Sequence, residues 1–346
     1  MRASSSEVFT ASTEVALDGI RAGGVDPRVI DITNAVARSR HPPIYQLGLA
    51  DARIAFGRAS ASMTLPPTSV VRATDHWVGA EESAITIRQY VGCETKDAMP
   101  SILFVHGGGW ALGSIDTHDT ICRALANEAR CHVFSVNYRL APERKFPLPI
   151  EDVVRAYVWV QGNACLLGVD KGRIAICGDS AGGNLAVAAA RIINSSRAPA
   201  TIGLQILFYP VLSLVLTDLE QYLGNGYLFD LEMLTWCSEH YLPSQAERSD
   251  PLASPARAKD LSGEPDTILV TAGFDMTART SLIYAAALKR IGKRVHVCHE
   301  PRLVHGFLSL GRVLPQAALA IASVAAVARQ WWGSPPQARG VSAAGT

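Results

Sequence analysis

The stretch Gly178-Asp179-Ser180-Ala181-Gly182-Gly183 decides the fold of this chain. It follows a short apolar run at 174–177 and precedes residues 184–191, which are rich in alanine, the best helix former. The local order is therefore strand, sharp turn and helix, with a serine at the turn. A Gly-x-Ser-x-Gly sequence in this setting is typical of a nucleophile elbow, which lifts a serine hydroxyl above the end of a sheet.

The glycines of this turn have a physical task. The serine needs a strained backbone angle so that its hydroxyl projects alone above the sheet. Gly178 and Gly182 lack a Cβ, so the strand and the helix can approach each other closely. Such turns also occur by chance in glycine-rich chains. The elbow hypothesis therefore requires a base, an orienting acid and oxyanion donors elsewhere in the chain.

Apolar runs alternate with helical patterns on both sides of the elbow. Two alternating stretches, 70–74 and 85–90, predict partly exposed antiparallel strands. A buried strand is expected at 102–105, and further strands at 132–136, 174–177, 204–209, 267–271 and 295–299. Helices are expected at 117–129, 149–161, 280–291 and 315–332. This rhythm predicts an α/β fold with a central, mostly parallel eight-stranded sheet that is flanked by helices.

Segments outside this rhythm suggest a cap. Helices are expected at 27–40 and 45–58, where they have no core of their own, and a helical stretch at 230–241 feeds no strand. The alternative for the segment that contains residues 230–241 is an ordinary helical crossover without substrate contacts. We predict N-terminal cap helices at 1–65, a core in two parts at 66–212 and 246–333, a cap insertion at 213–245 and a disordered tail at 334–346.

Composition excludes several classes of function. The chain has 346 residues, 48% hydrophobic and 18% charged, with a formal net charge of +1, so neither nucleic acid nor an anionic membrane is expected as a partner. Seven cysteines without a Cys-x-x-Cys pair argue against a disulfide framework and a zinc site. The first residues lack the apolar core of a signal peptide, and no apolar stretch is long enough to span a bilayer. We therefore expect a cytoplasmic protein without stable membrane insertion.

A second glycine-rich motif, His106-Gly107-Gly108-Gly109-Trp110, directly follows the strand at 102–105. Consecutive glycines let the backbone turn its N–H groups inward, as acyl transfer needs where a carbonyl oxygen becomes an oxyanion. We predict the N–H groups of Gly107, Gly108 and Ala181 as the donors. Loss of one such donor raises the barrier by roughly 3 kcal/mol. The weaker alternative is a merely flexible loop.

Order along the chain nominates the base and the acid. Of the nine histidines, His305 lies beyond the last strand and beside a glycine, where a loop can carry it over the elbow, with His299 as the runner-up. Asp275 follows the strand at 267–271, whereas Asp266 lies at the wrong end of it. Asp179 adjoins the nucleophile and is expected to brace the elbow or the glycine loop.

Together these motifs resemble the hormone-sensitive lipase family of carboxylesterases, bacterial family IV. The likeness extends from about Asp51 to the last helix, and the order Ser180, Asp275, His305 is that of the family. Further matching segments are 137–143 (Asn-Tyr-Arg-Leu-Ala-Pro-Glu), 146–147, 250–255, 271–275 and 305–307. The chain departs from the family pattern at Arg279, where relatives commonly carry an acidic residue, so the role of the later acids in the family is not carried over to this chain.

The resemblance implies a serine carboxylesterase for short- to medium-chain acyl esters, acting through an acyl-enzyme without a metal or organic cofactor. It also implies a homodimer contact through the last strand and helix, with Trp331 and Trp332 as candidates. An amidase or a lactonase on the same triad is an alternative that the sequence does not separate. A second alternative is a silent receptor like the plant gibberellin receptors, which lose the triad histidine that this chain retains as His305.

Two weaker predictions concern supporting residues. Arg139 and Asp152 are candidates for a pair beneath the site, with surface placement as the alternative. Five aromatic residues are candidates for an acyl pocket, although plain core packing is the commoner role of such side chains: Trp110, Tyr209, Phe229, Trp236 and Phe307.

Overall fold

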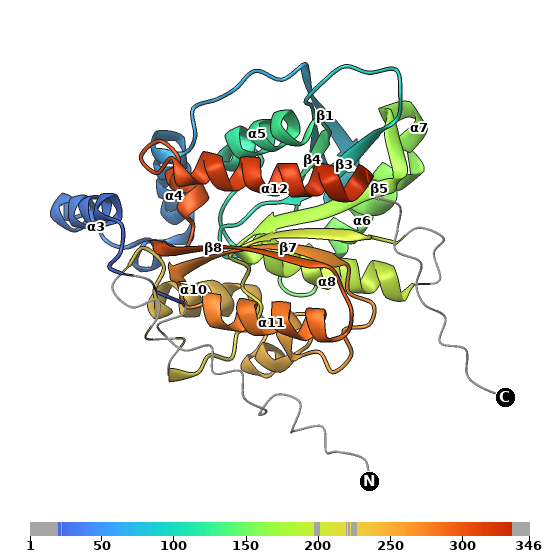
Figure 1. Ribbon diagram of the computed structural model, residues 1–346. Helices are drawn as coiled ribbons and strands as arrows, with labels where there is room; N and C mark the ends of the chain where they lie inside the picture. Colours follow the sequence, from blue (N-terminus) through green and yellow to red (C-terminus); the bar gives the residue numbers. More distant parts are fainter. Residues whose placement is uncertain are drawn as a thin grey trace, which may run out of the picture.

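The computed structural model describes residues 20–21, 23–196, 201–218, 220, 222 and 227–333. The predicted tail at 334–346 and the first 19 residues of the predicted N-terminal cap lie outside this part of the chain. An eight-stranded sheet runs through its centre in the order β1-β2-β4-β3-β5-β6-β7-β8 (Figure 1). Its strands are β1 (Arg72–Val78), β2 (Ile85–Val91), β3 (Met99–Val105), β4 (His132–Asn137), β5 (Val169–Asp179), β6 (Leu204–Phe208), β7 (Asp266–Phe274) and β8 (Val295–Val304).

The pairing of the strands confirms the predicted fold class. β2 pairs antiparallel with both β1 and β4, and every pair from β4 to β8 is parallel. β5 begins five residues earlier than predicted. Its first five residues, 169–173, are largely polar, so no apolar signal in the sequence marks a strand there. Parallel strands place their carboxyl ends at one edge, so the loops after β3, β5, β7 and β8 meet there.

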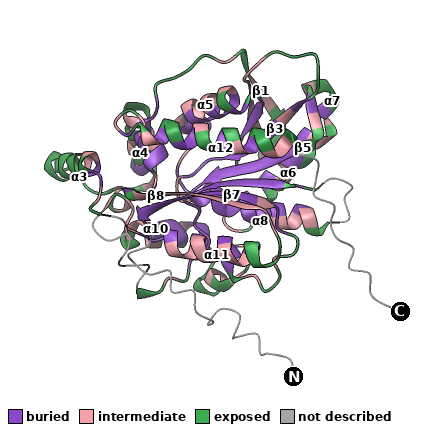
Figure 2. Ribbon diagram, viewed as in Figure 1, coloured by how far each residue is buried: buried purple, intermediate pink, exposed green. Residues whose placement is uncertain are grey.

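Helices cover both faces of the sheet. α5 (Asp119–Ala129) and α12 (Gln316–Gly333) pack on one face, while α6 (Leu148–Gly162), α8 (Ala181–Ser195) and α11 (Ala278–Arg290) pack on the other (Figure 1). The strands β3, β4, β6 and β7 are buried along almost all of their length, as Figure 2 shows, which explains their continuous apolar runs. The outer strand β1 is largely exposed, and most of β8 is of intermediate burial. Shorter elements are α7 (Ala164–Leu167), η2 (Glu81–Ser83), η3 (Asp116–His118), η4 (Gln245–Ser249), η5 (Pro255–Arg257) and η6 (Phe307–Leu310).

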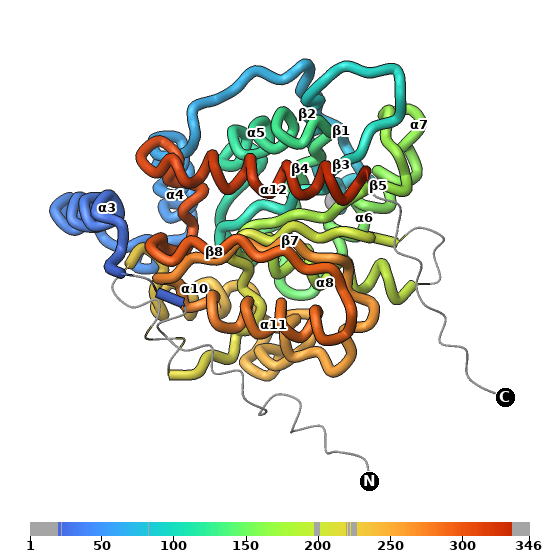
Figure 3. Tube along the Cα trace, viewed as in Figure 1, coloured from blue at the N-terminus to red at the C-terminus, as the bar shows by residue number. Residues whose placement is uncertain are grey.

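The N-terminal helices approach the carboxyl edge of the sheet. α3 (Pro27–Ser39) begins as predicted, with the Asp26 side chain accepting the N–H of Arg28 and proline in the first turn. The predicted second helix is divided into η1 (Ile44–Gln46) and α4 (Leu49–Met63), because Leu47 and Gly48 are extended. α4 contacts η3 and η6, and η1 contacts α10 (Leu231–Tyr241). In Figure 3, α3, α4 and α10 lie on the same side of the molecule.

The division into cap and core stays a prediction, although α4 and α10 both reach the edge where the site loops meet. β8 is an outer strand of the sheet, and the guanidinium of Arg294 lies 4.1 Å from the ring centre of Trp331. The homodimer remains a prediction that light scattering would test. No helix in the described ranges is long and apolar enough to cross a membrane.

Candidate active site

Ser180 lies at the turn between β5 and α8 in a strained conformation. Its φ of 53° and ψ of −120° are unusual for a residue with a side chain. The close approach expected at the flanking glycines is present, because a Cβ on Gly182 would collide with the carbonyl oxygen of Val105, and one on Gly178 with the carbonyl of Gly182. The turn is also fixed by the Ser180 N–H, which donates to the carbonyl of Phe208 at 2.9 Å. The backbone thus directs the hydroxyl of Ser180 away from the sheet.

Three side chains that lie far apart in sequence meet at this turn. The Oγ of Ser180 is 2.7 Å from Nε2 of His305, and Nδ1 of His305 is 2.9 Å from Oδ2 of Asp275. Asp275 directly follows β7 and His305 directly follows β8, so the sheet itself delivers both residues to the serine. The other carboxylate oxygen of Asp275 accepts the N–H of Thr277 at 2.8 Å. The chain of contacts can pass a proton from the hydroxyl to the imidazole while the carboxylate orients the ring.

The alternative base and acid lie elsewhere. Nε2 of His299 is 2.6 Å from the carbonyl oxygen of Ile20, and its Nδ1 is 2.7 Å from the hydroxyl of Thr271. Asp266 caps the far end of β7, where it pairs with Arg294 at 3.2 Å. Neither residue is part of the cluster around Ser180.

One predicted oxyanion donor is wrong. The N–H of Gly107 donates to Oδ1 of Asp179 at 2.8 Å, so it has no hydrogen left to offer a substrate. Gly108, Gly109 and Trp110 follow with φ angles of 115°, 59° and 61°, which turn the backbone sharply. Within the described part of the chain, the N–H groups of Gly108, Gly109 and Ala181 have no acceptor, and these three are the revised candidates.

Asp179 braces the glycine loop, as expected from its place beside the serine. Its carboxylate also lies 3.3 Å from Nε2 of His118, a residue that the sequence analysis did not single out. Burial alone would raise the pKa of Asp179, but His118 and the N–H of Gly107 hold that pKa below its usual value. Burial lowers the pKa of His106 to about 3, so this neighbouring imidazole is neutral at pH 7.

We expect Asp179→Asn to lower the free energy of unfolding by about 1–3 kcal/mol at pH 7, because a buried charged acceptor is lost. A depressed folded-state pKa contributes stability above the unfolded-state pKa, and that contribution disappears as the pH falls through the folded-state value. The difference between wild type and variant should therefore be largest near neutrality and shrink below about pH 3.9. Urea unfolding of both proteins between pH 7 and pH 3 measures this difference in the free energy of unfolding.

Asp170→Asn is the matched control, because Asp170 is on the same strand but half-exposed in its ion pair with Arg173. We expect little change in that variant. A difference for Asp179→Asn that grows on acidification would contradict the assigned brace.

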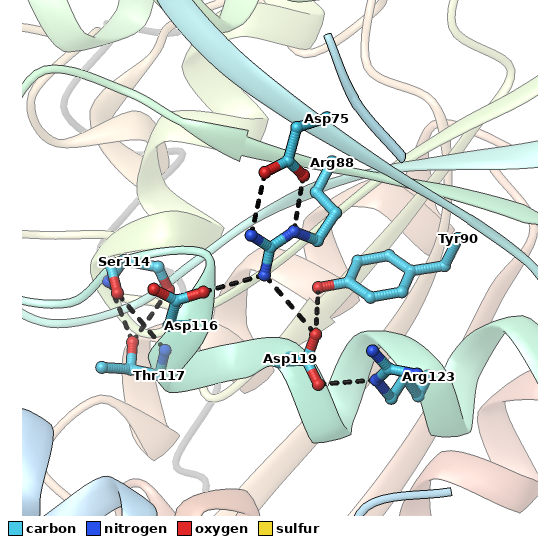
Figure 4. A network of polar contacts seen from close by, with 8 residues as sticks. All are labelled: Asp75, Arg88, Tyr90, Ser114, Asp116, Thr117, Asp119 and Arg123. Atoms are coloured by element: carbon cyan, nitrogen blue, oxygen red, sulfur yellow. Dashed lines mark hydrogen bonds and ion pairs between the residues drawn. The ribbon is translucent and has the colours of Figure 1, made fainter. Parts of the chain in front are cut away.

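A charged network fixes the segment that carries His118. Arg88 on β2 pairs with Asp75 at 2.6 Å and with Asp116 at 2.8 Å, and it therefore ties two strands to η3 (Figure 4). The hydroxyl of Tyr90 donates to Asp119 at 2.8 Å, at the start of α5. Further contacts in the same network come from Ser114, Thr117 and Arg123 (Figure 4). The loop that follows the glycines is thereby held to the sheet.

The candidate aromatic residues fall into two groups. The ring of Phe229 stacks on His305 with 4.2 Å between centroids, and Tyr209 lies 5.0 Å from the same imidazole. Phe307 packs on Tyr209, whereas Trp110 stacks on Tyr241 and Trp236 lies against His240. Of the five candidates, Phe229 and Tyr209 thus contact His305 directly. A role in an acyl pocket stays a prediction for all five aromatic residues.

Two charged residues noted in the sequence have defined partners. Arg139 donates to the fully buried Asp152 at 2.7 and 2.9 Å, so the predicted pair forms. Arg279, the predicted departure from the family pattern, lies 3.7 Å from the buried carboxylate of Glu220, which also accepts from Thr280. The departure at Arg279 therefore supplies a contact between the start of α11 and the predicted cap insertion.

Among the residues that the structure describes, no group of three or more His, Cys, Asp or Glu side chains is arranged to hold an ion. All seven cysteines are free.

Comparison with known proteins places the chain in a family. A model of the alpha/beta hydrolase fold family matches residues 102–309. The chain is 35% identical to the ethyl acetate hydrolase of Pseudomonas putida over 219 residues, which are 63% of this chain and 69% of the relative. It is 34% identical to the arylesterase of Saccharolobus solfataricus over 262 residues, 75% of this chain and 85% of that enzyme.

A solved structure agrees over most of the length. An ester hydrolase from the metagenome of Lake Arreo superposes with a TM-score of 0.85 at 31% identity, covering 90% of this chain and 100% of that one. Its match extends well beyond residues 102–309. The chain therefore belongs to the α/β-hydrolase fold family, and within it to the hormone-sensitive lipase-like carboxylic ester hydrolases of bacterial family IV.

Proposed function

We propose that this carboxylic ester hydrolase cleaves short- to medium-chain acyl esters through a Ser180–His305–Asp275 triad and an acyl-enzyme intermediate. The observation that carries the proposal is the unbroken line of contacts from the serine hydroxyl through His305 to Asp275, at 2.7 and 2.9 Å. All three residues are buried, with exposures of 8%, 7% and 0%, so the contacts operate in a low-dielectric setting.

The reaction proceeds in two steps. Nε2 of His305 takes the proton of the Ser180 hydroxyl as Oγ attacks the ester carbonyl, and the resulting oxyanion accepts hydrogen bonds from Gly108, Gly109 and Ala181. The imidazolium then gives its proton to the leaving alcohol, and the acyl group remains on Ser180. Water attacks this acyl-enzyme by the same route and releases the acid. Asp275 keeps the proton of neutral His305 on Nδ1 throughout.

A cavity beside α10 supports the chain-length part of the proposal. It has a volume of about 270 Å³ and lies between the segment after β6 and α10, with mostly apolar walls formed by Leu214, Val215, Leu216, Leu231, Leu234, Thr235 and Arg248. Leu234 is one helical turn before Cys237, whose side chain lies against Gly109. We propose this cavity for the acyl chain of a bound ester, because the helix that lines it also carries the side chain against Gly109. A cavity of this size holds a short or medium chain better than a long one.

A series of p-nitrophenyl esters from acetate to palmitate tests the function. We expect kcat/KM to be highest among the short and medium chains and to fall by about tenfold or more for palmitate, because a long chain exceeds the cavity. Equal rates for all chain lengths would contradict the assigned pocket. No turnover of any ester would contradict the esterase itself, and hydrolysis of anilides or lactones in preference to esters would favour the amidase or lactonase.

A further inference from the structure

Arg53, on the N-terminal helix α4, contacts the oxyanion loop from outside. Its Nε donates to the carbonyl oxygen of Ala111 at 2.9 Å, and its Nη2 donates to that of Ala141 at 3.0 Å. Ala111 is the second residue after Gly109 in the chain. The N–H of Ala141 donates in turn to the carbonyl of Trp110 at 3.0 Å. The guanidinium of Arg53 therefore contacts both the end of the glycine loop, at Ala111, and the neighbouring segment at Ala141, which is itself hydrogen-bonded to the loop.

Glu143 holds this guanidinium in place. Its two carboxylate oxygens each accept from Arg53 at 2.7 Å in a bidentate pair. The hydrogen bonds from Arg53 hold the pKa of Glu143 below its usual range. Both side chains are partly exposed, at 30% and 55%, and pairs in such settings add little to overall stability. The arrangement is better suited to directing a backbone than to stabilising the fold.

The oxyanion loop needs such support. Gly108, Gly109 and Trp110 have consecutive positive φ angles, and for Trp110 this conformation is strained. Strained backbone persists only where the surroundings impose it. From the core side, the loop is held by Asp179 at Gly107 and by the N–H of Leu112, which donates to the carbonyl of Gly108 at 2.8 Å. Arg53 supplies the contact from the cap side.

We propose, on the basis of the proposed function, that Arg53 is a positioning residue for the oxyanion hole. Its contacts with Ala111 and Ala141 set the direction in which the N–H groups of Gly108 and Gly109 point. The rate of the acyl-transfer step then depends on a helix that lies before the segment matched by the family model. Glu143 serves only to orient the guanidinium.

The decisive variants are Arg53→Ala and Arg53→Lys, with Arg58→Ala as the matched control on an exposed position of the same helix. Arg53→Ala should lower kcat for p-nitrophenyl acetate by about 10- to 100-fold, because displacement of a catalytic group by about 1 Å costs up to about 100-fold. KM should stay within about threefold. Arg53→Lys should fall between, since one ammonium does not reproduce the planar fork. Arg58→Ala should stay within about threefold of wild type.

Chemical rescue separates positioning from a structural role. A cavity of about 460 Å³ borders the site, lined by Arg53, Arg139, Leu140, Glu143 and Arg144, and gives a small cation access to the vacated place. Guanidinium at millimolar concentration should restore part of kcat in Arg53→Ala, whereas tetramethylammonium, which donates no hydrogen bond, should not. Affinity for a trifluoromethyl ketone, which forms a tetrahedral adduct with an oxyanion, should fall in parallel with kcat/KM.

Several results would overturn the inference. Unchanged kcat in Arg53→Ala, a rise confined to KM, or equal rescue by both cations would each do so. Thermal unfolding of all variants identifies any loss of fold. If Arg53→Ala does not fold, the comparison of kcat between Arg53→Lys and wild type tests the proposal. An inactive wild type would instead refute the proposed function, so failures of the two proposals are distinguishable.

Discussion

Ser180→Ala is expected to lower kcat for a short p-nitrophenyl ester by roughly 10⁴- to 10⁶-fold, because the variant has no atom to form the acyl-enzyme. What remains is the rate enhancement from the oxyanion hole and substrate binding alone. The fold should be retained, since the strained backbone of the turn is fixed by glycine packing and by the N–H of residue 180, which the substitution leaves intact. Steady-state kinetics and far-UV circular dichroism measure the two properties.

The control for this variant is Ser195→Ala, at the other end of the same helix, where an exposed hydroxyl donates to the carbonyl of Ile192. That change should leave kcat within about twofold, as expected for a surface substitution. A Ser180→Ala enzyme with activity within a few-fold of wild type would refute the assigned nucleophile. Trapping of a covalent adduct at Ser180 by an organophosphate, detected by mass spectrometry, provides a second measurement.

Asp275→Asn is expected to lower kcat by roughly 10³- to 10⁴-fold, through the tautomer of His305. The carboxylate has two duties, accepting the N–H of Thr277 at Oδ1 and Nδ1–H of His305 at Oδ2. An asparagine satisfies Thr277 with its carbonyl oxygen and then turns its NH₂ group toward His305. The ring must accept at Nδ1 and carry its proton on Nε2, where it no longer accepts the proton of Ser180.

Asp266→Asn provides the comparison, because it lies at the opposite end of the same strand. Its kcat should stay within about threefold of wild type, while the ion pair with Arg294 is lost. Measurements from pH 6 to pH 9 would show whether the loss of kcat in Asp275→Asn persists across this range. A loss of less than about tenfold at pH 8 would argue that Asp275 does not orient the base.

The fold was predictable because its signals are local. Strand-like apolar runs mark β3, β4 and β6 within a few residues of their observed bounds, and the Asp26-Pro27 pair marks the start of α3. Boundaries failed where local signals were weak. The polar first half of β5 is a strand because it pairs near Met99 of β3, a partner distant in sequence.

Long-range hydrogen bonds were not predictable in the same way. Three glycines in a row offer three N–H groups, and the sequence does not reveal that the first is taken by Asp179, 72 residues away. His118 and Arg53 were missed for the same reason, since no spacing rule links a helix residue to a loop that it contacts only after folding.

The sequence by itself determined the fold class and nominated Ser180, His305 and Asp275, because an elbow and the ends of successive parallel strands are written as local patterns. Only the tertiary structure decided which donors of the glycine loop are free, what holds that loop, and where Arg279 finds its partner. The physical reason is that a hydrogen bond or ion pair between distant segments requires its two atoms to lie about 3 Å apart, within a few tenths of an ångström. Those distances exist only once the sheet and its helices are packed.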